Sequence, residues 1–426
     1  MNVHESEKIA GLLGSIGFSA CGLVEDADIL VFNTCCIRDT AEKKILGNIG
    51  DVKALKKSRK DLIIAVVGCM TQQDGSADAL IKSYPFVNIV LGTHNIGVLP
   101  EKVSEILKKQ AKTAIEIDKN ERPEICETLP AVRTSGTNAW VNIMYGCDNF
   151  CTYCIVPYVR GRERSRDFAA ILSEVKSLLA EGYKEITLLG QNVDSYSNNG
   201  KVFADLLEEI AAVEGKFRLR FMTSHPKDFN SRVIDIIAKS PNVCKNIHLP
   251  VQSGSNRVLN LMNRKYTRER YLEIVAEIRK KIPNVGLTSD IMTGFPTETE
   301  EDFLDTLSLT EAAGFSNAFT FVYSPRKGTA AAKMEQLPAE IKRERIKKLV
   351  ALQNEITKEI SKTYLEKVEE ILVEDAAKKA GFVCGRTDSG RLVTVKGDKN
   401  LIGKFINVKI TAVKSAALFG ETEEKQ

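Results

Sequence analysis

Between residues 139 and 322 the chain repeats one pattern six times, an apolar run of strand length followed by an amphipathic stretch of helix length. The expected strands are residues 140–144, 185–189, 218–222, 245–249, 285–291 and 317–322. Strands that alternate with helices form a parallel sheet covered by helices, which is an α/β fold. Six units exceed an average open sheet and fall short of the eight of a closed barrel, so we expect a partial (β/α)6 barrel.

Unusual residues follow each of these expected strands. They are Gly146-Cys147, Gly190-Gln191-Asn192, Ser224-His225-Pro226, Pro250-Val251-Gln252-Ser253-Gly254-Ser255, Gly294-Phe295-Pro296 and Ser324-Pro325-Arg326. Active sites of α/β barrels are built from the loops at the carboxyl ends of the strands. The sequence therefore predicts that the chemistry gathers at one rim. His225 and His248 lie at this rim, and we interpret both as structural histidines with satisfied hydrogen bonds.

The segments on either side carry different patterns. Residues 1–115 alternate helices with expected strands at 29–32, 62–67 and 87–91, which predicts an N-terminal parallel α/β domain. This segment starts at a helix, whereas a doubly wound sheet usually starts at a strand. Residues 108–137 show no periodicity, and we interpret them as a linker. A long helix is expected over 338–363, and short apolar runs within 364–426 predict a small β-barrel.

Composition narrows the class of protein. With 43% hydrophobic and 27% charged residues, the chain of 426 residues has the balance of a globular protein and not of a disordered one. Its longest uncharged apolar run, residues 62–70, is about half of a membrane span. The first eight residues lack the apolar segment of a secretory signal. We therefore expect a cytoplasmic protein without membrane contact. The net charge of +4 neither favours nor excludes nucleic acid.

Three of the ten cysteines form one motif. Cys147, Cys151 and Cys154 are spaced as C-x3-C-x2-C on the loop after the first barrel strand. A cytosolic chain keeps its thiols reduced, which argues against a disulfide framework. A structural zinc site takes four ligands, whereas a [4Fe-4S] cube held by three cysteines keeps one iron open. The motif favours an open-sided [4Fe-4S] cluster, with zinc bound to a distant fourth ligand or plain buried thiols as the alternatives.

Two further cysteines, Cys35 and Cys69, stand at the ends of neighbouring expected strands of the N-terminal domain. Ligands of parallel α/β sheets gather outside the carboxyl ends of the strands, where these two thiols are placed to converge. The alternative is two small buried residues. Isolated, semi-apolar cysteines are expected at Cys21, Cys126, Cys244 and Cys384.

The cysteine motif, with Tyr153 before its last cysteine, resembles that of the radical S-adenosylmethionine (SAM) enzymes. The resemblance implies that the open iron chelates the amino and carboxylate groups of SAM, whose reductive cleavage yields a 5′-deoxyadenosyl radical. The segment at Gly294 resembles the one that lies near the cofactor adenine. The SAM-binding residues that the resemblance implies are Tyr153, Gln191, Gln252, Gly294, Phe295 and Pro296.

Longer segments are similar to the methylthiotransferases, namely residues 141–166, 190–193 and 248–255. This resemblance covers essentially the whole chain. It implies an N-terminal methylthiotransferase domain (1–115), a radical SAM core (133–363) and a C-terminal TRAM domain that grips RNA (364–426). The implied reaction adds a methylthio group to C2 of N(6)-dimethylallyladenosine next to the anticodon of tRNA, using two SAM molecules and two [4Fe-4S] clusters.

The resemblance implies that Cys35, Cys69 and a third cysteine hold the second, auxiliary cluster, whose open iron carries the transferred sulfur. That third cysteine belongs to a Gly-Cys-Gln directly before a Met-Asn, and the present sequence starts at Met1-Asn2. We expect a start assigned too late, with a truncated chain as the alternative. Cys36 is not expected to substitute, because adjacent residues on a strand point to opposite faces.

The implied partners are the anticodon stem-loop of tRNA, an electron donor and a sulfur donor. Alternating arginines at 160, 162, 164 and 166 would lie on one side of an extended segment, which suits RNA phosphates or the cofactor carboxylate. Salt bridges to Glu163 and its neighbours are the alternative. We name Arg160, Arg162, Lys396 and Lys404 as candidate RNA-binding residues, with a solvated surface as the alternative for the lysines.

Three other functions stay open from the sequence. Two lie inside the family, with threonylcarbamoyladenosine in tRNA or an aspartate of a ribosomal protein as the substrate. The third is a non-catalytic tRNA-binding relic whose auxiliary site holds no cluster.

Overall fold

The computed structural model describes residues 1–36, 39–120, 123, 125 and 129–423, so that Cys126 lies outside the described residues. The chain divides into two compact units. The first unit comprises Met1–Thr134, Tyr145–Phe150 and Cys154–Arg166, and the second comprises Ser135–Met144, Cys151–Tyr153 and Asp167–Gln426. Within the described residues, no helix combines the length and the apolar character needed to cross a membrane.

The first unit is built on a parallel sheet with the strand order β1-β2-β3-β4. The strands are β1 (Ile29–Thr34), β2 (Ile63–Gly68), β3 (Ile89–Leu91) and β4 (Ala114–Glu116). The first three confirm the expected strands. Strand β4 corrects the expected linker over 108–137. Its three residues carry too short a pattern to be recognised, and pairing of Ala114 with Ile89 of β3 makes them a strand.

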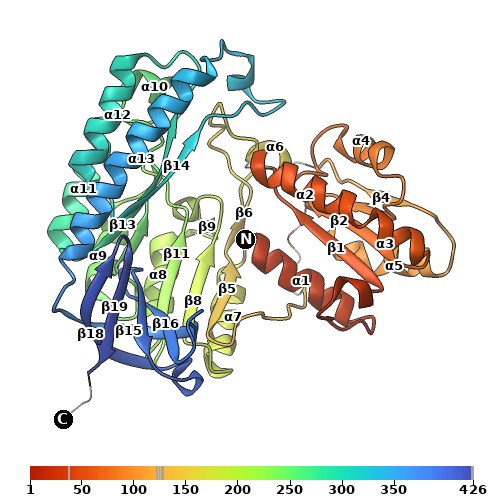
Figure 1. The fold of residues 1–426 in the computed structure, drawn as a ribbon, viewed down its shortest axis with the longest axis horizontal. Helices are drawn as coiled ribbons and strands as arrows, with labels where there is room; N and C mark the ends of the chain where they lie inside the picture. The colour runs from red at the N-terminus through yellow and green to blue at the C-terminus, as the bar shows by residue number, and fades with distance from the viewer. Residues whose placement is uncertain (37–38, 121–122, 124, 126–128, 424–426) are drawn as a thin grey trace. The chain divides into compact units, whose positions relative to one another are not determined.

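Helices cover both faces of this sheet (Figure 1). Ile63, Ala65 and Val67 of β2 pack with α1 and α5, whereas Ile64 and Val66 pack with α2 and α4. Burial on both faces explains why β2 reads as a continuous apolar run. The helices of this unit are α1 (Asn2–Gly14), η1 (Val24–Asp26), α2 (Asp39–Asp51), α3 (Lys53–Ser58), α4 (Ser76–Ser83), η2 (Ile96–Val98), α5 (Leu99–Leu107) and α6 (Val156–Arg160).

The second unit contains six parallel strands that follow one another in chain order. They are β5 (Asn138–Asn142), β8 (Glu185–Leu189), β11 (Arg218–Met222), β12 (Asn246–His248), β13 (Gly286–Thr293) and β14 (Asn317–Val322). Two three-stranded sheets, β5-β8-β11 and β12-β13-β14, are linked by a parallel bridge between Leu219 and Val243. This arrangement confirms the partial (β/α)6 barrel, and every strand end lies within two residues of its expected position.

Amphipathic helices connect these strands and surround a common apolar core (Figure 1). Side-chain oxygens cap five of them, because Asp167, Asn230, Ser255, Thr267 and Thr299 each accept a hydrogen bond from a first-turn backbone N–H. The helices are α7 (Phe168–Ala180), α8 (Phe203–Ala211), α9 (Ser231–Lys239), α10 (Asn256–Leu261), α11 (Arg268–Lys281), α12 (Glu300–Ala313) and α13 (Ala339–Lys362). Shorter elements of this unit are η3 (Val193–Ser195), β9 (Ser197–Asn198), β10 (Lys201–Val202) and η4 (Ala330–Lys333). Strand β7 (Arg164–Ser165) belongs to the first unit, and β6 (Met144–Tyr145) has one residue in each.

The C-terminal part of the second unit is a closed five-stranded barrel with the order β15-β16-β17-β19-β18. Its elements are β15 (Val368–Ala376), β16 (Phe382–Thr387), β17 (Leu392–Lys396), η5 (Lys399–Leu401), β18 (Phe405–Lys414) and β19 (Ala417–Thr422). Alternate residues of β17, Val393 and Val395, point into its core. The expected small C-terminal β-barrel is thereby confirmed.

Residues 387–390 of this barrel, here called the anchor loop, pack on the amino-terminal ends of the (β/α)6 strands. Arg220 donates to the carbonyl oxygens of Thr387 at 2.9 Å and Asp388 at 3.3 Å. Asn246 donates to the carbonyl oxygen of Ser389 at 3.2 Å. A Cβ at Gly286 would collide with that same oxygen. The second unit therefore keeps its two barrels in close contact through backbone carbonyls.

Candidate metal and cofactor sites

The three cysteines of the C-x3-C-x2-C motif lie on the loop between β6 and α6. Gly146, directly before Cys147, has a φ of +78°, and a Cβ there would collide with the carbonyl oxygen of Arg162. Phe150, directly before Cys151, is also left-handed, with a φ of +45°. Such residues turn a chain sharply, and glycine does so at no steric cost. The motif therefore sits on a tightly turned loop after the first barrel strand, as its spacing predicted.

The three sulfur atoms have different surroundings. The Cys147 Sγ accepts a hydrogen bond from Asn149 Nδ2 at 3.5 Å, and Cys154 is half-buried. Cys151 is 9% exposed, and its Sγ accepts from Arg264 Nη1 at 3.5 Å. Among the described residues, no three His, Cys, Asp or Glu side chains are already gathered as a metal site. Thiolates are the ligands that iron–sulfur clusters take, and a buried cation offsets their charge, so the donor set fits a [4Fe-4S] cluster.

Arg264 was missed by the sequence analysis, because no motif marks it. It is 4% exposed and lies between two left-handed residues, Asn263 and Lys265. Its Nη2 donates to the carbonyl oxygen of Pro250 at 2.8 Å, and its Nε donates to the Tyr266 hydroxyl at 3.0 Å. Burial alone would lower the pKa of Arg264, but Tyr266, Tyr153 and Cys151 outweigh burial and raise the pKa well above its usual range. A permanent buried cation therefore stands beside Cys151.

The turn after β13 is held by a buried ion pair. The Gly294 backbone N–H donates to Glu298 Oε2 at 2.8 Å, and the same oxygen accepts from Arg345 Nη1 at 2.8 Å. Gly294 has a φ of +69°, and a Cβ there would lie 2.6 Å from the side chain of Lys342. Phe295 is fully buried against Tyr323. Gly294, Phe295 and Pro296 thus form a fixed turn at the carboxyl end of the fifth barrel strand.

The other expected SAM-binding residues lie at the same ends of the strands. The Tyr153 hydroxyl accepts from Arg264 Nη1 at 3.5 Å. Gln252 is buried and left-handed, and its backbone pairs with Asp290 and Met292 of β13 at 2.8 Å each. Gln191 is half-buried directly after β8. The fold therefore places all of them at the predicted rim, and their contact with SAM stays a prediction.

We expect Arg345→Met to lower the free energy of unfolding by about 3–5 kcal/mol, because it leaves the Glu298 carboxylate buried without its cation. Burial already raises the pKa of Glu298 above its usual range. Chemical denaturation followed by circular dichroism measures the effect. The matched control is Arg343→Met on the same helix, whose partner Glu340 is exposed, so that its loss costs under about 1 kcal/mol. Equal losses in the two variants would contradict the prediction.

A group of polar side chains follows β8 and β11. Asn192 Nδ2 donates to Asp228 Oδ2 at 2.7 Å, and Asp194 Oδ2 accepts from the His225 backbone N–H at 2.9 Å. His248, by contrast, pairs with Thr288 Oγ1 at 3.0 Å and lies 3.8 Å from Asp290, as expected for a structural histidine. His225 corrects that expectation. Its Nδ1 accepts from the Lys227 backbone N–H, but its Nε2 has no partner among the described residues.

Asp194 is expected to make stability depend on pH. Burial raises its pKa to about 7, so between about pH 4 and pH 7 the folded chain holds a proton that the unfolded chain releases. The free energy of unfolding therefore falls as the pH rises through this window, by at most about 1.4 kcal/mol per pH unit.

Asp194→Asn removes this contribution, so the variant gains stability relative to the wild type from pH 4 to pH 7. Urea unfolding of both proteins across the window measures the difference. Burial also lowers the pKa of His225 to about 2, so this residue makes the free energy of unfolding rise with pH below its usual pKa. Both proteins contain His225, so this contribution cancels in the comparison. Parallel stability curves would show that Asp194 titrates as an ordinary carboxyl.

In the first unit, three cysteines directly follow the ends of β1 and β2. The Cys69 N–H donates to the Thr34 carbonyl oxygen at 3.2 Å, which aligns the two strand ends. Cys36 is fully buried and its pKa is raised by Cys69, which is also buried, whereas Cys35 is half-buried. Strand alternation does not reach Cys36, because β1 ends at Thr34, so the expectation that Cys36 does not substitute loses this argument and stays untested. The convergence of Cys35 and Cys69 on one metal cluster stays a prediction, and Cys36 is a further thiol near the same strand ends.

Arg160 places a positive charge near the thiols of Cys35 and Cys69. It ends α6, is 6% exposed and donates to Asn2 Oδ1 at 3.3 Å. The neighbouring Cys36 thiol, together with the Arg160 guanidinium, lowers the pKa of Cys69 to about 5, while the pKa of Cys36 rises far above its usual value. The extended arrangement expected for the arginines is wrong, because Arg160 is helical and Gly161 turns the chain.

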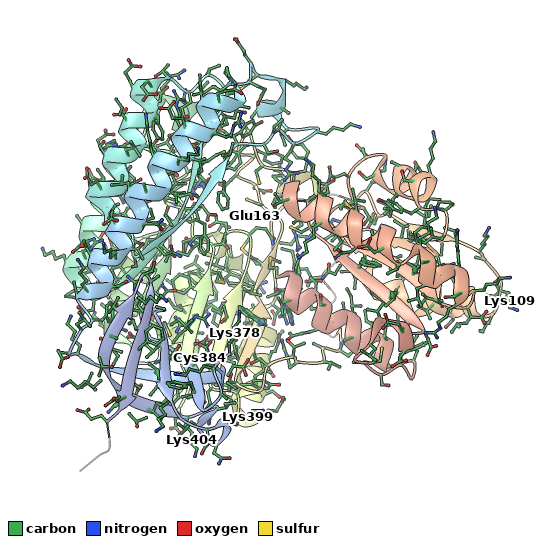
Figure 2. The ribbon with its side chains drawn as sticks, viewed as in Figure 1. Lys109, Glu163, Lys378, Cys384, Lys399 and Lys404 are labelled. Atoms are coloured by element: carbon green, nitrogen blue, oxygen red, sulfur yellow. The ribbon has the colours of Figure 1, made fainter. Side chains whose placement is uncertain are left out.

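The other candidate RNA-binding residues are more exposed. Arg162 Nε pairs with Asp148 at 3.1 Å, and its guanidinium covers the Phe150 ring at 4.9 Å. Lys396 and Lys404 are exposed on the C-terminal barrel. Figure 2 shows Lys378, Lys399 and Lys404 on the same barrel, and all three are exposed. RNA binding by these lysines stays a prediction.

Family comparisons match three stretches of the chain. The model of the Radical SAM superfamily matches residues 141–310, Uncharacterized protein family UPF0004 matches residues 1–92, and the TRAM domain matches residues 362–422. Among solved structures, the radical SAM methyltransferase TsrM from Kitasatospora setae, with cobalamin and a [4Fe-4S] cluster bound, has a TM-score of 0.58 at 14% identity. That comparison covers 77% of this chain and 73% of the other, and it supports the fold alone.

Curated relatives match over nearly the full length. A tRNA-2-methylthio-N(6)-dimethylallyladenosine synthase of Clostridium botulinum (strain Loch Maree / Type A3) is 51% identical over 426 residues, which cover 99% of this chain and 94% of the relative. Synthases with the same name from Clostridium tetani and Desulforamulus reducens are 51% and 47% identical. The chain therefore belongs to the tRNA-2-methylthio-N(6)-dimethylallyladenosine synthases, a family of radical SAM enzymes.

Proposed function

We propose that this chain adds a methylthio group to C2 of N(6)-dimethylallyladenosine next to the anticodon of tRNA. The observation that carries the proposal is the identity of about half of all residues with synthases of that name, over 94% of the relative's length. The C-terminal barrel, which matches the TRAM domain, supports RNA as the substrate. In this proposal the enzyme acts in the cytoplasm, where an electron donor and a sulfur donor supply the reaction.

The two thiol groups are the proposed cluster sites. Cys147, Cys151 and Cys154 would hold the radical cluster, and Cys35 and Cys69 would hold the auxiliary one. When bound, the clusters and SAM supply a radical that removes hydrogen from C2 and a methylated sulfur that takes its place. A C–H bond at an aromatic carbon has no acidity that a side-chain base can use, so the cofactors carry the difficult step.

The chain's own residues position the reactants and balance their charge. Arg264 and Arg160 each place a buried guanidinium beside the proposed ligands Cys151 and Cys69. The fixed turn of Gly294, Phe295 and Pro296 is the proposed seat of the cofactor adenine, and Tyr153, Gln191 and Gln252 complete the SAM site. Arg162, Lys396 and Lys404 remain candidates for RNA phosphates, whereas the buried Arg160 is reassigned to the auxiliary thiols.

A substrate comparison tests the proposal. The chain is reconstituted anaerobically with iron and sulfide and given SAM, a reductant and an anticodon stem-loop RNA. We expect the methylthio nucleoside, identified by mass spectrometry after digestion, from RNA that carries N(6)-dimethylallyladenosine. RNA with unmodified adenosine or threonylcarbamoyladenosine, and a peptide with the ribosomal-protein aspartate, are the matched controls. Product from one of these controls alone would overturn the substrate, and RNA binding without any product would support the relic.

A further inference from the structure

His225 presents a buried hydrogen-bond donor that the protein does not use. The side chain is 6% exposed and lies on the loop after β11, the third barrel strand. Its Nδ1 accepts from the Lys227 backbone N–H at 3.2 Å. Because that nitrogen is an acceptor, the proton of the neutral imidazole sits on Nε2. The described residues offer no acceptor to this Nε2–H. A buried donor without a partner is costly, so the site requires an acceptor from a ligand or from ordered water.

The imidazole is held as a neutral ring. Burial, together with the charges of Arg264 and Lys227, lowers the pKa of His225 to about 2. The ring packs edge-to-face against Tyr266, with the centroids 5.7 Å apart, and the Tyr266 hydroxyl accepts from Arg264. Arg264 in turn bonds to Cys151, a proposed ligand of the radical cluster. The unused donor therefore lies in the same packed group as the proposed cluster ligand.

The neighbouring loop carries an unused acceptor. Asn192, directly after β8, is 1% exposed, and its Nδ2 is committed to Asp228 Oδ2 at 2.7 Å. Its Oδ1 has no partner among the described residues. This Asn192–Asp228 hydrogen bond joins the two loops, and within the loop after β11 the Asp228 backbone N–H donates to the His225 carbonyl oxygen at 2.9 Å. A donor and an acceptor on adjoining loops match one edge of adenine, where N7 accepts and N6–H donates.

We propose that His225 Nε2–H donates to N7 of the target adenine and that Asn192 Oδ1 accepts from its N6–H. This inference rests on the proposed function and names the residues that hold the base. A neutral donor suits a ring nitrogen, which carries no charge. N7 belongs to the five-membered ring, away from C2, so this contact leaves the reacting carbon clear. An alkyl group on N6 leaves one N–H for Asn192.

Equilibrium binding of RNA without reductant tests the proposal independently of turnover. The probes are an anticodon stem-loop carrying N(6)-dimethylallyladenosine and the same RNA with 7-deaza-N(6)-dimethylallyladenosine, which lacks the acceptor. We expect the wild type to bind the first RNA about tenfold more tightly, because the second leaves the buried N–H unpaired. His225→Phe keeps the ring packing without a donor and is expected to bind both RNAs equally. His225→Gln restores a donor, and part of the preference returns.

His248→Phe is the matched control at the same rim, because the nitrogens of His248 already face Thr288 and Asp290. This variant should prefer the RNA with N7 as strongly as the wild type does. A preference that persists in His225→Phe, or is absent from the wild type, overturns the inference and leaves the proposed function standing. The inference is also overturned if His225→Phe binds SAM more weakly but keeps the RNA preference. That result would assign the His225 donor to the cofactor adenine. A wild type that binds neither RNA overturns both proposals.

Discussion

Cys151→Ala is expected to remove about four irons per chain after anaerobic reconstitution and to abolish both 5′-deoxyadenosine and the methylthio product. A cube bound by three thiolates does not survive the loss of one, and Cys151 is the buried member of the motif, next to the Arg264 guanidinium. Iron and sulfide analysis, with chromatography of the products, measures both effects.

The control for this variant is Cys21→Ala, which removes an exposed thiol outside both proposed sites and should keep the full iron content. Unchanged iron in Cys151→Ala would show that the motif does not hold a cluster. Stoichiometric zinc in the wild type in place of iron would remove the basis of the radical mechanism.

The second large effect is expected from Cys69→Ala, which should separate the two halves of the reaction. The proposed radical site keeps its three cysteines, so about four irons remain and SAM is still cleaved to 5′-deoxyadenosine. The methylthio product disappears, because the auxiliary site has lost one of its proposed ligands, a buried thiol beside the charge of Arg160. The ratio of 5′-deoxyadenosine to methylthio nucleoside, measured in one reaction, reports this uncoupling.

Cys244→Ala is the matched control, since it also removes a fully buried thiol, but in the second unit and away from both motifs. That variant should form both products in the wild-type ratio. Loss of 5′-deoxyadenosine together with the methylthio product in Cys69→Ala would mean that the two thiol groups do not serve separate clusters.

Much of the fold was predictable because its elements carry strong local patterns. The barrel strands β8, β11 and β14 have the expected bounds, since each is a short run of strand length between clear helices. Strand β4 was not predictable, because three residues are too few to show a period and their state depends on pairing with β3. A strand that exists through a distant partner leaves little local signal.

The candidate sites divide in the same way. The spacing of Cys147, Cys151 and Cys154 lies within eight residues, so the sequence alone displays the motif. Arg264 reaches Cys151 across 113 positions of the chain, and no short motif records such a contact. The argument about Cys36 depended on the exact end of β1, and strand ends are the least certain part of a sequence-based assignment.

The anchor loop changes how the RNA-binding part of this protein has to be studied. Arg218 is 5% exposed and donates to the carbonyl oxygens of Arg386 and, at 2.9 Å, of Glu370, so it depends on the C-terminal barrel for its hydrogen bonds. Deleting that barrel would remove these acceptors from the buried Arg218 guanidinium, whereas Arg220 would lose two carbonyl partners and keep its ion pair with Glu185. If the truncated protein fails to methylthiolate RNA, the cause could therefore be a destabilised (β/α)6 barrel as well as the loss of RNA binding. Single substitutions of exposed lysines such as Lys396 and Lys404 separate the two causes, because they leave the hydrogen bonds between the two barrels of the second unit intact.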